Sequence, residues 1–413
     1  MNVEALRKSD PELADLVERE RRRQNETIDL IASENLCPTS VCEAVGSILT
    51  DKYAEGYPAH RCYGGCETID EVERLAIERG KRLFGCEHLN VQPHSGSQAN
   101  MAVYFACLKP GDTILAMDLA HGGHLTHGMK ANFSGRLYRI VHYGVSRKTE
   151  RIDYDALARQ AREVRPDLLV AGASSYPRAI DVARLADIAH AAGARLLVDM
   201  AHFAGLVVGG VHPDPVPVAD FVTATTHKTL RGPRGGIVMC RAKNARAIDR
   251  AIFPGLQGGP LMHIIAGKAA AFALAEAPEF KAYQVQTVAN ARAMAEEMLS
   301  LGYRLVSGGT DTHLLLVDVG PQNMTGTEAE RRLGKAGIVV NHNVIPFDTR
   351  PPAQGSGIRI GTPSITTRGA NEDDARAIAR WIDRILKADD PSREAKGVRK
   401  DVAEFCRTHP IPA

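Results

Sequence analysis

Short apolar runs alternate with helical patterns through the first two thirds of the chain. Six of these runs are nearly continuous in apolar residues, which is typical of strands buried on both faces of a sheet. They lie at 113–117, 137–142, 168–173, 195–198, 221–224 and 236–240. Between them, residues 156–164 and 183–192 repeat apolar positions at the spacing of a helix. The alternation predicts an α/β fold with a mainly parallel sheet flanked by helices, whose ligands bind beyond the carboxyl ends of the strands.

The last third of the chain follows a different pattern. A long helical pattern over 279–301 follows Pro278, and another covers 372–386. Short strand patterns lie between them, at 303–307, 313–319, 338–341 and 358–360. This mixture indicates a smaller α+β domain. We therefore expect three parts: an N-terminal helical arm over 1–30, a large domain over 31–281 and a small C-terminal domain over 282–413.

The arm carries an amphipathic helix. Residues 10–12 have the composition of a helix start, with a capping acid and a proline at the first helical position. Leu13, Leu16 and Val17 then form a narrow apolar stripe on an otherwise charged helix. Such a stripe is expected to dock on another domain or on another subunit.

Composition and charge exclude several classes of protein. The chain has 413 residues, of which 44% are hydrophobic and 24% charged, with a formal net charge of +2. This balance does not indicate a nucleic-acid-binding surface. No apolar run has the length of a membrane span and the start lacks a signal-peptide pattern, so we expect a cytoplasmic protein. The eight cysteines form no CxxC pair, and no metal site is expected.

The stretch "TATTHKTLRGPRGG", residues 223–236, raises the question of what Lys228 does. A phosphate-binding loop of the nucleotide-triphosphatase type needs one glycine directly before its lysine and another five residues earlier. Those positions hold His227 and Val222, so this reading fails. A lysine that follows a buried strand is also how enzymes hold an aldehyde cofactor such as pyridoxal phosphate.

That second reading requires an acid for the pyridine nitrogen and a cup for the phosphate. Asp199 directly follows the strand at 195–198, although a carboxylate there could also bind a ribose or a metal, or cap a turn. Ser95-Gly96-Ser97 precedes an apolar helix, where backbone amides and hydroxyls can bind an anion, although an ordinary helix cap has the same composition. A second flexible loop contains Gly258-Gly259.

Further groups suit the ring, the substrate carboxylate and proton transfer. His121, His124 and His127 lie in a glycine-rich loop, where one imidazole stacked on a flat ring is a better reading than a metal site. Arg359, in a short strand of the last third, is suited to binding a carboxylate. The loop at 53–63 gathers three tyrosines and Glu55, which form either an interface or a proton-transfer set.

Eight motifs together are similar to those of the serine hydroxymethyltransferases. They are "ASEN" (32–35), "KYAEGYP" (52–58), "QPHSGSQAN" (92–100), "LAHGGHLTHG" (119–128), "VDMAH" (198–202), "THKTLRGPRGG" (226–236), "QGGP" (257–260) and "GIRIGTP" (357–363). The resemblance runs in unbroken order from about residue 29 to about residue 369. It implies a pyridoxal-phosphate enzyme of fold type I, the aspartate-aminotransferase type. Such enzymes interconvert serine and glycine and move a one-carbon unit to and from tetrahydrofolate.

The resemblance also implies roles for individual residues. Lys228 would carry pyridoxal phosphate covalently as a Schiff base, with Asp199 at the pyridine nitrogen and His124 stacked on the ring. The other cofactor-binding residues would be Ser95, Gly96, Ser97, Ser174, His202 and His227, joined by Tyr53, Gly258 and Gly259 from the partner subunit of a homodimer. The substrate would contact Arg359, Ser33 and His202, together with Glu55 and Tyr63 from the partner subunit, Glu55 transferring the proton. Tetrahydrofolate would lie against Leu119, Gly123, Leu125 and Asn343.

Two loops depart from the family's pattern. Residues 342–344 read His-Asn-Val where Lys-Asn-Ser or Lys-Asn-Thr is usual, and the tyrosine loop has Ala59-His60 and Cys62 where Gly-Lys or Gly-Arg and an aromatic residue are usual. The cofactor assignment is unaffected. The departures leave open an α-methylserine hydroxymethyltransferase or a threonine-type aldolase on the same scaffold. A non-enzymatic binding protein on this scaffold is the alternative from another class, and the set Lys228, Asp199 and Arg359 argues against it.

Overall fold

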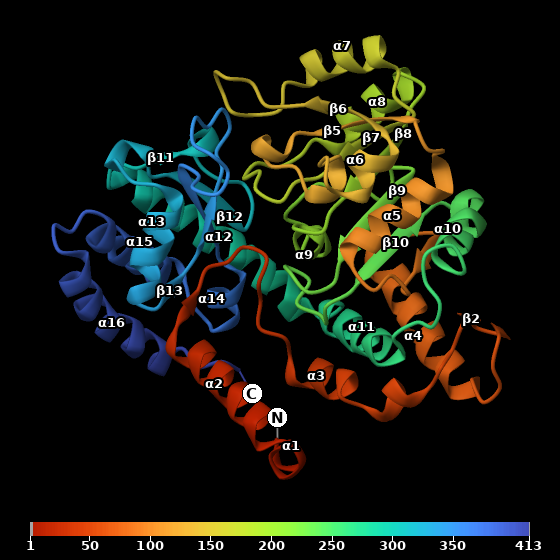
Figure 1. Cartoon of the computed structure of the whole chain (residues 1–413), viewed down its shortest axis with the longest axis horizontal. Coiled ribbons are helices and arrows are strands. Elements are labelled where there is room, and N and C mark those ends of the chain that lie inside the picture. Colours follow the sequence, from red (N-terminus) through yellow and green to blue (C-terminus); the bar gives the residue numbers. More distant parts are fainter. Residues whose placement is uncertain (1–2, 413) are drawn as a thin grey trace.

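A computed structural model describes residues 3–412 and arranges them around two main sheets (Figure 1). The larger sheet has seven strands in the order β4-β10-β9-β8-β7-β5-β6. Their bounds are β4 His88–Asn90, β5 Thr113–Met117, β6 Arg139–Tyr143, β7 Leu168–Ala171, β8 Arg195–Asp199, β9 Phe221–Thr225 and β10 Gly236–Cys240. In this sheet β5 to β9 pair in parallel, whereas β10 is antiparallel to both of its neighbours. The predicted α/β fold is confirmed, with a mixed central sheet.

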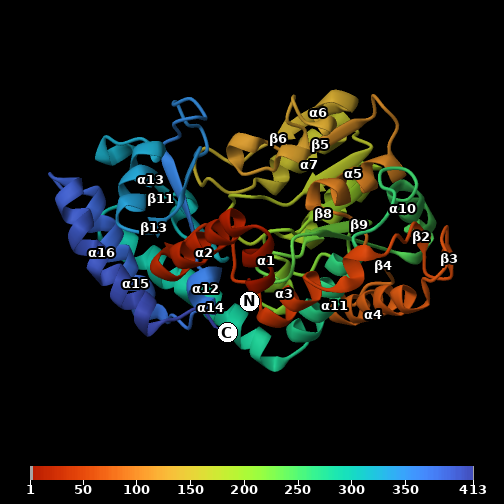
Figure 2. The same ribbon diagram turned by 60° about the horizontal axis from the view of Figure 1, so that its bottom comes forward.

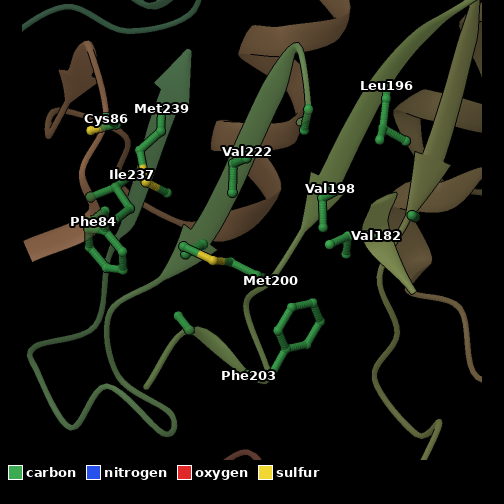
Figure 3. Close-up of a cluster of buried hydrophobic side chains, with 14 of the residues drawn as sticks. Phe84, Cys86, Val182, Leu196, Val198, Met200, Phe203, Val222, Ile237 and Met239 are labelled. Atoms are coloured by element: carbon green, nitrogen blue, oxygen red, sulfur yellow. The ribbon is translucent and has the colours of Figure 1, made fainter. Parts of the chain in front are cut away.

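The two faces of this sheet are covered by different helices, which explains why its strands are apolar at consecutive positions. In β8, for example, Leu197 packs with helices α5 and α10 on one face, whereas Leu196 and Val198 pack with α4, α8 and α11 on the other. Figure 3 shows this second face, with Val198 and Val222 on neighbouring strands. The helices of this part are α3 Thr39–Val45, α4 Glu67–Phe84, α5 Gly96–Cys107, α6 Phe133–Leu137, α7 Tyr154–Val164, α8 Val182–Ala191, α9 Ala204–Val208, α10 Ala245–Ile252 and α11 Met262–Ala275.

The second sheet is antiparallel and has its own core. Its strand order is β11-β12-β15-β14, with bounds β11 Arg304–Leu305, β12 Leu314–Asp318, β14 Asn341–Asn343 and β15 Gly357–Gly361. Side chains such as Leu315 and Ile360 pack there with the surrounding helices. These helices are α12 Pro278–Ser300, α13 Gly326–Lys335, α14 Pro363–Thr367, α15 Glu372–Leu386 and α16 Pro391–Thr408.

The arm and helix α12 connect the two parts of the molecule. The arm consists of α1 Glu4–Ser9, α2 Pro11–Glu26 and β1 Ile28–Asp29, and β1 pairs in parallel with β13 Ile338–Val339. Helix α12 bonds to the larger part through the Gln284 amide, which donates to the carbonyl of Thr229 at 2.7 Å, and places Met294 and Met298 in the second core. The domain limits at residues 30 and 281 stay predictions.

Two strand predictions in the last third are wrong in their extent. The strand expected at 303–307 ends at Leu305, because Ser307 has a φ of 59° and the chain turns. Arg178 holds that turn, donating to both the hydroxyl and the carbonyl of Ser307. The run at 338–341 divides between β13 and β14, which belong to different sheets. In the larger sheet, β4 was missed.

The apolar stripe of α2 remains about half exposed in the described chain. Leu13, Leu16 and Val17 are 45%, 49% and 39% exposed, and Ala14 is the helix's buried residue. Figure 2 shows α1 and α2 on the outside of the molecule. The expectation that this stripe docks on another domain or on another subunit stays a prediction. Across residues 3–412, every helix is too short or too polar to cross a membrane.

Candidate active site

A cavity of about 440 Å³ lies where several strands of the larger sheet end at their carboxyl sides. Strand β8 ends at Asp199, β9 leads into Lys228, and the loop after β4 leads into the start of α5. Arg359 reaches the same cavity from β15 of the second sheet. The remaining lining residues are Ser33, Glu34, Ser95, Gly96, Ser97, His124, His127, Ala173, Ser174, Ala201, His202, Thr225, His227 and Arg234.

Lys228 is held rigidly through its backbone. Its carbonyl accepts hydrogen bonds from the Asn35 side-chain amide at 3.1 Å and from the Arg231 N–H at 3.0 Å. Burial lowers the pKa of Lys228 from its ordinary 10.5 to about 8, and the Asp199 carboxylate opposes part of that fall. A lysine with such a pKa offers a neutral, nucleophilic amine near physiological pH.

Asp199 is 8% exposed and is kept as a carboxylate by three donors. Its Oδ2 accepts from the Asn100 amide at 2.8 Å and from His127 Nε2 at 3.2 Å, and its Oδ1 accepts from the Ala201 N–H at 3.0 Å. Burial alone would raise the pKa of Asp199, but the hydrogen bonds from His127 and Asn100 hold it well below its usual range. His127 Nδ1 accepts from the backbone N–H of His124, so Nε2 carries the proton that points to Asp199.

Behind Asp199 lies a buried hydrogen-bond chain that also fixes His124. The Thr223 hydroxyl donates to Asn100 Oδ1 at 2.6 Å, and the Asn100 amide donates to Thr126 Oγ1 at 2.8 Å. Thr126 Oγ1 in turn lies 2.8 Å from His124 Nδ1. Because Thr126 accepts from Asn100, its hydroxyl proton is free to point to His124 Nδ1. Burial lowers the pKa of His124 to about 4, so this imidazole is neutral at pH 7.

The start of α5 has the geometry of a cup that could bind an anion. Ser95 caps the helix by accepting from the Gln98 N–H at 3.2 Å, and the first N–H groups of a helix have no intrahelical acceptor. A side chain at Gly96 would come within 2.6 Å of the Thr225 methyl group, so only glycine fits there. Burial, followed by the charge of Arg234, lowers the pKa of His227 to about 3. Among the described residues, the buried Nδ1 of His227 has no hydrogen-bond partner.

Arg359 is a buried cation whose hydrogen-bond partners are neutral. It is 9% exposed and donates to the Asn341 side chain at 3.1 Å, the Ser174 carbonyl at 2.7 Å and the Ser33 hydroxyl at 3.5 Å. Burial lowers its pKa to about 10. In residues 3–412 it forms no salt bridge with a carboxylate, although a buried guanidinium is best stabilised by one. The cavity side of Arg359 therefore suits a carboxylate ligand.

Five predicted site residues form a separate group outside this cavity. The rings of Tyr53 and Tyr63 meet edge to face with centroids 5.2 Å apart, and both side chains are about half exposed. The Glu55 carboxylate raises the pKa of Tyr63. A side chain at Gly258 would come within 2.8 Å of Glu55 Oε1, and one at Gly259 within 3.2 Å of the Tyr53 ring. The predicted site is thus divided into two groups within one chain.

A second cavity of about 300 Å³ adjoins the first and shares His124 and Ser174 with it. All four residues predicted to contact tetrahydrofolate line it, together with both residues that depart from the family's pattern in the 342–344 loop. The full lining is Leu119, Gly123, His124, Leu125, Ser174, Ser175, His342, Asn343, Val344 and Pro352. His342 Nδ1 is hydrogen-bonded to the Glu330 carboxylate, so the substituted histidine is held in place.

Sequence reasoning missed several residues of the first cavity. Asn100 lies within the quoted motif 92–100, and Arg234 within 226–236, but neither was assigned a role. His127 was named with His121 and His124 as a candidate for ring stacking or, less well, metal binding, and not as the donor to Asp199. Its nitrogen, one from His124 and an Asp199 oxygen do lie within 4.8 Å of one another. These atoms already hydrogen-bond to Thr126 and Asn100 and to each other, which accounts for their closeness without an ion.

The residues present fit pyridoxal phosphate. The cavity offers a nucleophilic lysine, an ionised acid, a glycine cradle for an anion, and an arginine without a carboxylate partner. The buried Nδ1 atoms of His202 and His227 are also without partners among the described residues. All five features are those that this cofactor and an amino-acid substrate require.

Comparisons with known proteins agree with this chemistry. The sequence profile of the serine hydroxymethyltransferase family matches residues 6–382. A serine hydroxymethyltransferase of Acidobacterium capsulatum is 55% identical over 407 residues, which cover 98% of this chain and 95% of that protein. The likeness therefore extends over nearly the full length of both chains.

The lowered pKa of Lys228 gives a testable prediction for the cofactor-free protein. Since the neutral amine is the reactive form, the rate of covalent capture of pyridoxal phosphate should rise with pH around a midpoint of about 8. In Asp199→Asn the midpoint should be lower, because the carboxylate that favours the ammonium form is gone. Stopped-flow absorbance at a series of pH values measures the capture rate and so the midpoint. A wild-type midpoint near 10 would contradict the assignment.

Proposed function

The chain belongs to the serine hydroxymethyltransferase family and has that family's activity, the reversible conversion of serine and tetrahydrofolate into glycine and 5,10-methylenetetrahydrofolate; from this premise we propose which residues carry the reaction. The 55% identity to a serine hydroxymethyltransferase, over 98% of this chain, favours this activity over the α-methylserine and aldolase alternatives. The first cavity holds pyridoxal phosphate and the amino acid, and the adjoining cavity holds tetrahydrofolate. The observation that carries the proposal is the convergence of Lys228, Asp199 and Arg359 on one cavity.

The cofactor is held at three points. Lys228 is its covalent anchor, the amides of 95–97 with His227 bind the phosphate, and neutral His124 lies flat on the ring. Bound there, pyridoxal phosphate supplies an electron sink for the bonds at the substrate Cα. Asp199 keeps the pyridine nitrogen protonated, and it can do so because three donors keep Asp199 itself ionised. Arg234 adds positive charge at the phosphate side of the cavity.

The substrate is oriented by groups on opposite sides of the cavity. Arg359 and Ser33 bind its carboxylate, which supplies the anionic partner that Arg359 lacks. Ser174, whose carbonyl accepts from Arg359, and His202 lie beside the ring oxygen of the cofactor. By fixing the carboxylate, Arg359 and Ser33 would determine which bond at Cα is placed for cleavage.

The second group of residues serves the active site of the partner subunit in a homodimer. Tyr53, Glu55, Tyr63, Gly258 and Gly259 gather on an exposed surface of their own chain, outside the cavity. In the partner's site Glu55 transfers the proton and Tyr63 orients the substrate, while Tyr53 and the two glycines complete the phosphate cup. The exposed stripe of α2 supports an association between subunits.

The adjoining cavity suits the flat ring system of tetrahydrofolate. Leu119 and Leu125 are 44% and 46% exposed and offer apolar surface at its walls. Gly123 is required there, because a side chain at this position would come within 2.2 Å of the Met117 carbonyl. Asn343 supplies a polar group for the ring edge. The shared residues His124 and Ser174 bring the one-carbon acceptor next to the amino acid.

The proposed role of Lys228 predicts a specific loss of activity. Lys228→Ala should fold normally and lose turnover of serine with tetrahydrofolate by about three orders of magnitude or more, because the covalent anchor is gone. The exposed Lys243→Ala is the matched control and should keep wild-type turnover. Assays with serine, α-methylserine and allo-threonine, each with and without tetrahydrofolate, measure both activity and preference. Substantial turnover by Lys228→Ala would overturn the assignment.

The divided site predicts complementation between two inactive variants. In a heterodimer of Lys228→Ala and Glu55→Gln, one site receives intact Lys228 and intact Glu55, whereas the other site carries both defects. Random mixing makes half of the dimers heterodimers, so about one quarter of the wild-type activity should return. The measurement is turnover after subunit exchange that native mass spectrometry has verified. If exchange occurs and no activity returns, Glu55 acts within its own chain.

A further inference from the structure

Lys268 is a buried lysine to which none of the roles above applies. It lies in the middle of α11 and is 1% exposed. Its Nζ donates to three backbone carbonyls: Val91 at 2.6 Å, Pro93 at 3.1 Å and Gly236 at 2.8 Å. Burial lowers its pKa to about 7, but three acceptors around its Nζ need the three N–H groups of the charged form. Burying an ammonium group costs several kcal/mol unless all its donors are used. A leucine or methionine would fill the same space but would leave three carbonyls without this donor, so the ammonium group serves the backbone that surrounds it.

The three carbonyls belong to the frame of the anion-binding cup. Val91 and Pro93 lie in the segment that joins β4 to Ser95, and Gly236 begins the neighbouring strand β10. The Gly236 N–H also donates to the Pro93 carbonyl, at 3.0 Å. Gln257 completes the frame, donating to the Gln92 carbonyl at 2.9 Å and accepting from the His94 N–H at 3.1 Å. The segment that places the first amides of α5 is therefore held by the side chains of Asn90, Gln257 and Lys268, of which Lys268 is the charged one.

Glycine is needed at positions 235 and 236 because Lys268 and the Ser95 carbonyl approach the backbone there closely. A side chain at Gly235 would come within 2.6 Å of Lys268 Cε and 3.0 Å of its Nζ. One at Gly236 would come within 2.3 Å of the Ser95 carbonyl. The two glycines that end the motif "THKTLRGPRGG" thus allow close packing beside the cup, in addition to the turn after Lys228.

The charge of Lys268 is also felt inside the cavity. After burial, Arg234 and Lys228, it is a further cause of the lowered pKa of His227, which lines the cup. Lys268 lowers the pKa of His94 in the same way. The cup therefore receives positive potential from a group that does not itself touch the cavity.

We propose that Lys268 is a positioning residue for the cofactor phosphate: it fixes the 91–94 segment, and with it the anion-binding start of α5, and adds positive potential to the cup. This inference rests on the proposed function, because it assumes that the cup binds the phosphate of pyridoxal phosphate. It assigns Lys268 an effect on the phosphate group alone, and not on the ring or on the amino acid.

The experiment compares pyridoxal phosphate with pyridoxal, which lacks the phosphate. Dissociation constants of both are measured by equilibrium dialysis with the cofactor-free full-length protein and its Lys268→Met variant. We expect Lys268→Met to weaken binding of pyridoxal phosphate about tenfold or more and to change binding of pyridoxal less than about twofold. A purely structural role would weaken both equally, or neither.

Arg368→Met is the matched control. Arg368 is 6% exposed and donates to backbone carbonyls, including those of His409, Thr27 and Cys406, at the junction of the arm with the second core. This variant should lower the melting temperature, because buried carbonyls lose their donor, and keep the wild-type ratio of the two constants. A folded Lys268→Met with an unchanged ratio would overturn the inference. A wild-type protein that does not prefer pyridoxal phosphate to pyridoxal would instead overturn the proposed cofactor site.

A milder variant keeps the inference testable if Lys268→Met does not fold. In Gly235→Ala the added methyl group must displace the Lys268 side chain while leaving its charge, and the ratio should fall by severalfold. Gly334→Ala, where a side chain meets no atom within 4 Å, is its control and should keep the wild-type ratio. An unchanged ratio in folded Gly235→Ala would contradict a dependence of the cup on the position of Lys268.

Discussion

Lys228 and Asp199, of opposite charge, are buried at one edge of one sheet, and the rest of the site is organised by the need to keep both there. A buried carboxylate tends to take up a proton and a buried amine tends to lose one. The protein allows Lys228 to lose its proton and prevents Asp199 from taking one up. Burial lowers the pKa of Lys228 to about 8, whereas three hydrogen-bond donors hold Asp199 ionised. A reactive amine and an ionised carboxylate therefore lie in one cavity.

Buried polar chains extend this control beyond the residues that touch the ligands. The chain from Thr223 through Asn100 and Thr126 to His124 fixes both the acid and the stacking imidazole. On the other side, Lys268 and Gln257 hold the backbone that leads into the phosphate cup. Cavity-lining groups are thus backed by a second set of residues, which fixes their geometry and comes from strands, helices and loops around the sheet.

Much of the fold and several residues of the candidate site could be predicted from the pattern of the sequence, because apolar strands and glycine loops are local signals. The strands at 113–117 and 236–240 and the helix at 372–386 were predicted with the limits that the structure has. Strand β4 was missed because its three residues, one of them strongly apolar, are too few for a periodic signal. Contacts between distant segments could not be predicted. Asn100 meets Thr223 across 123 residues, and Lys268 meets Val91 across 177, and only the packing of the sheet brings them together.

The central claim is that Lys228 is the covalent anchor of the cofactor. Borohydride reduction of the protein loaded with pyridoxal phosphate, followed by proteolysis and peptide mass mapping, tests it directly, because reduction makes the lysine–cofactor bond permanent. We expect the cofactor mass on the peptide that contains Lys228 and on no other peptide. Attachment at Lys268 or at a surface lysine, with an unmodified Lys228, would contradict it.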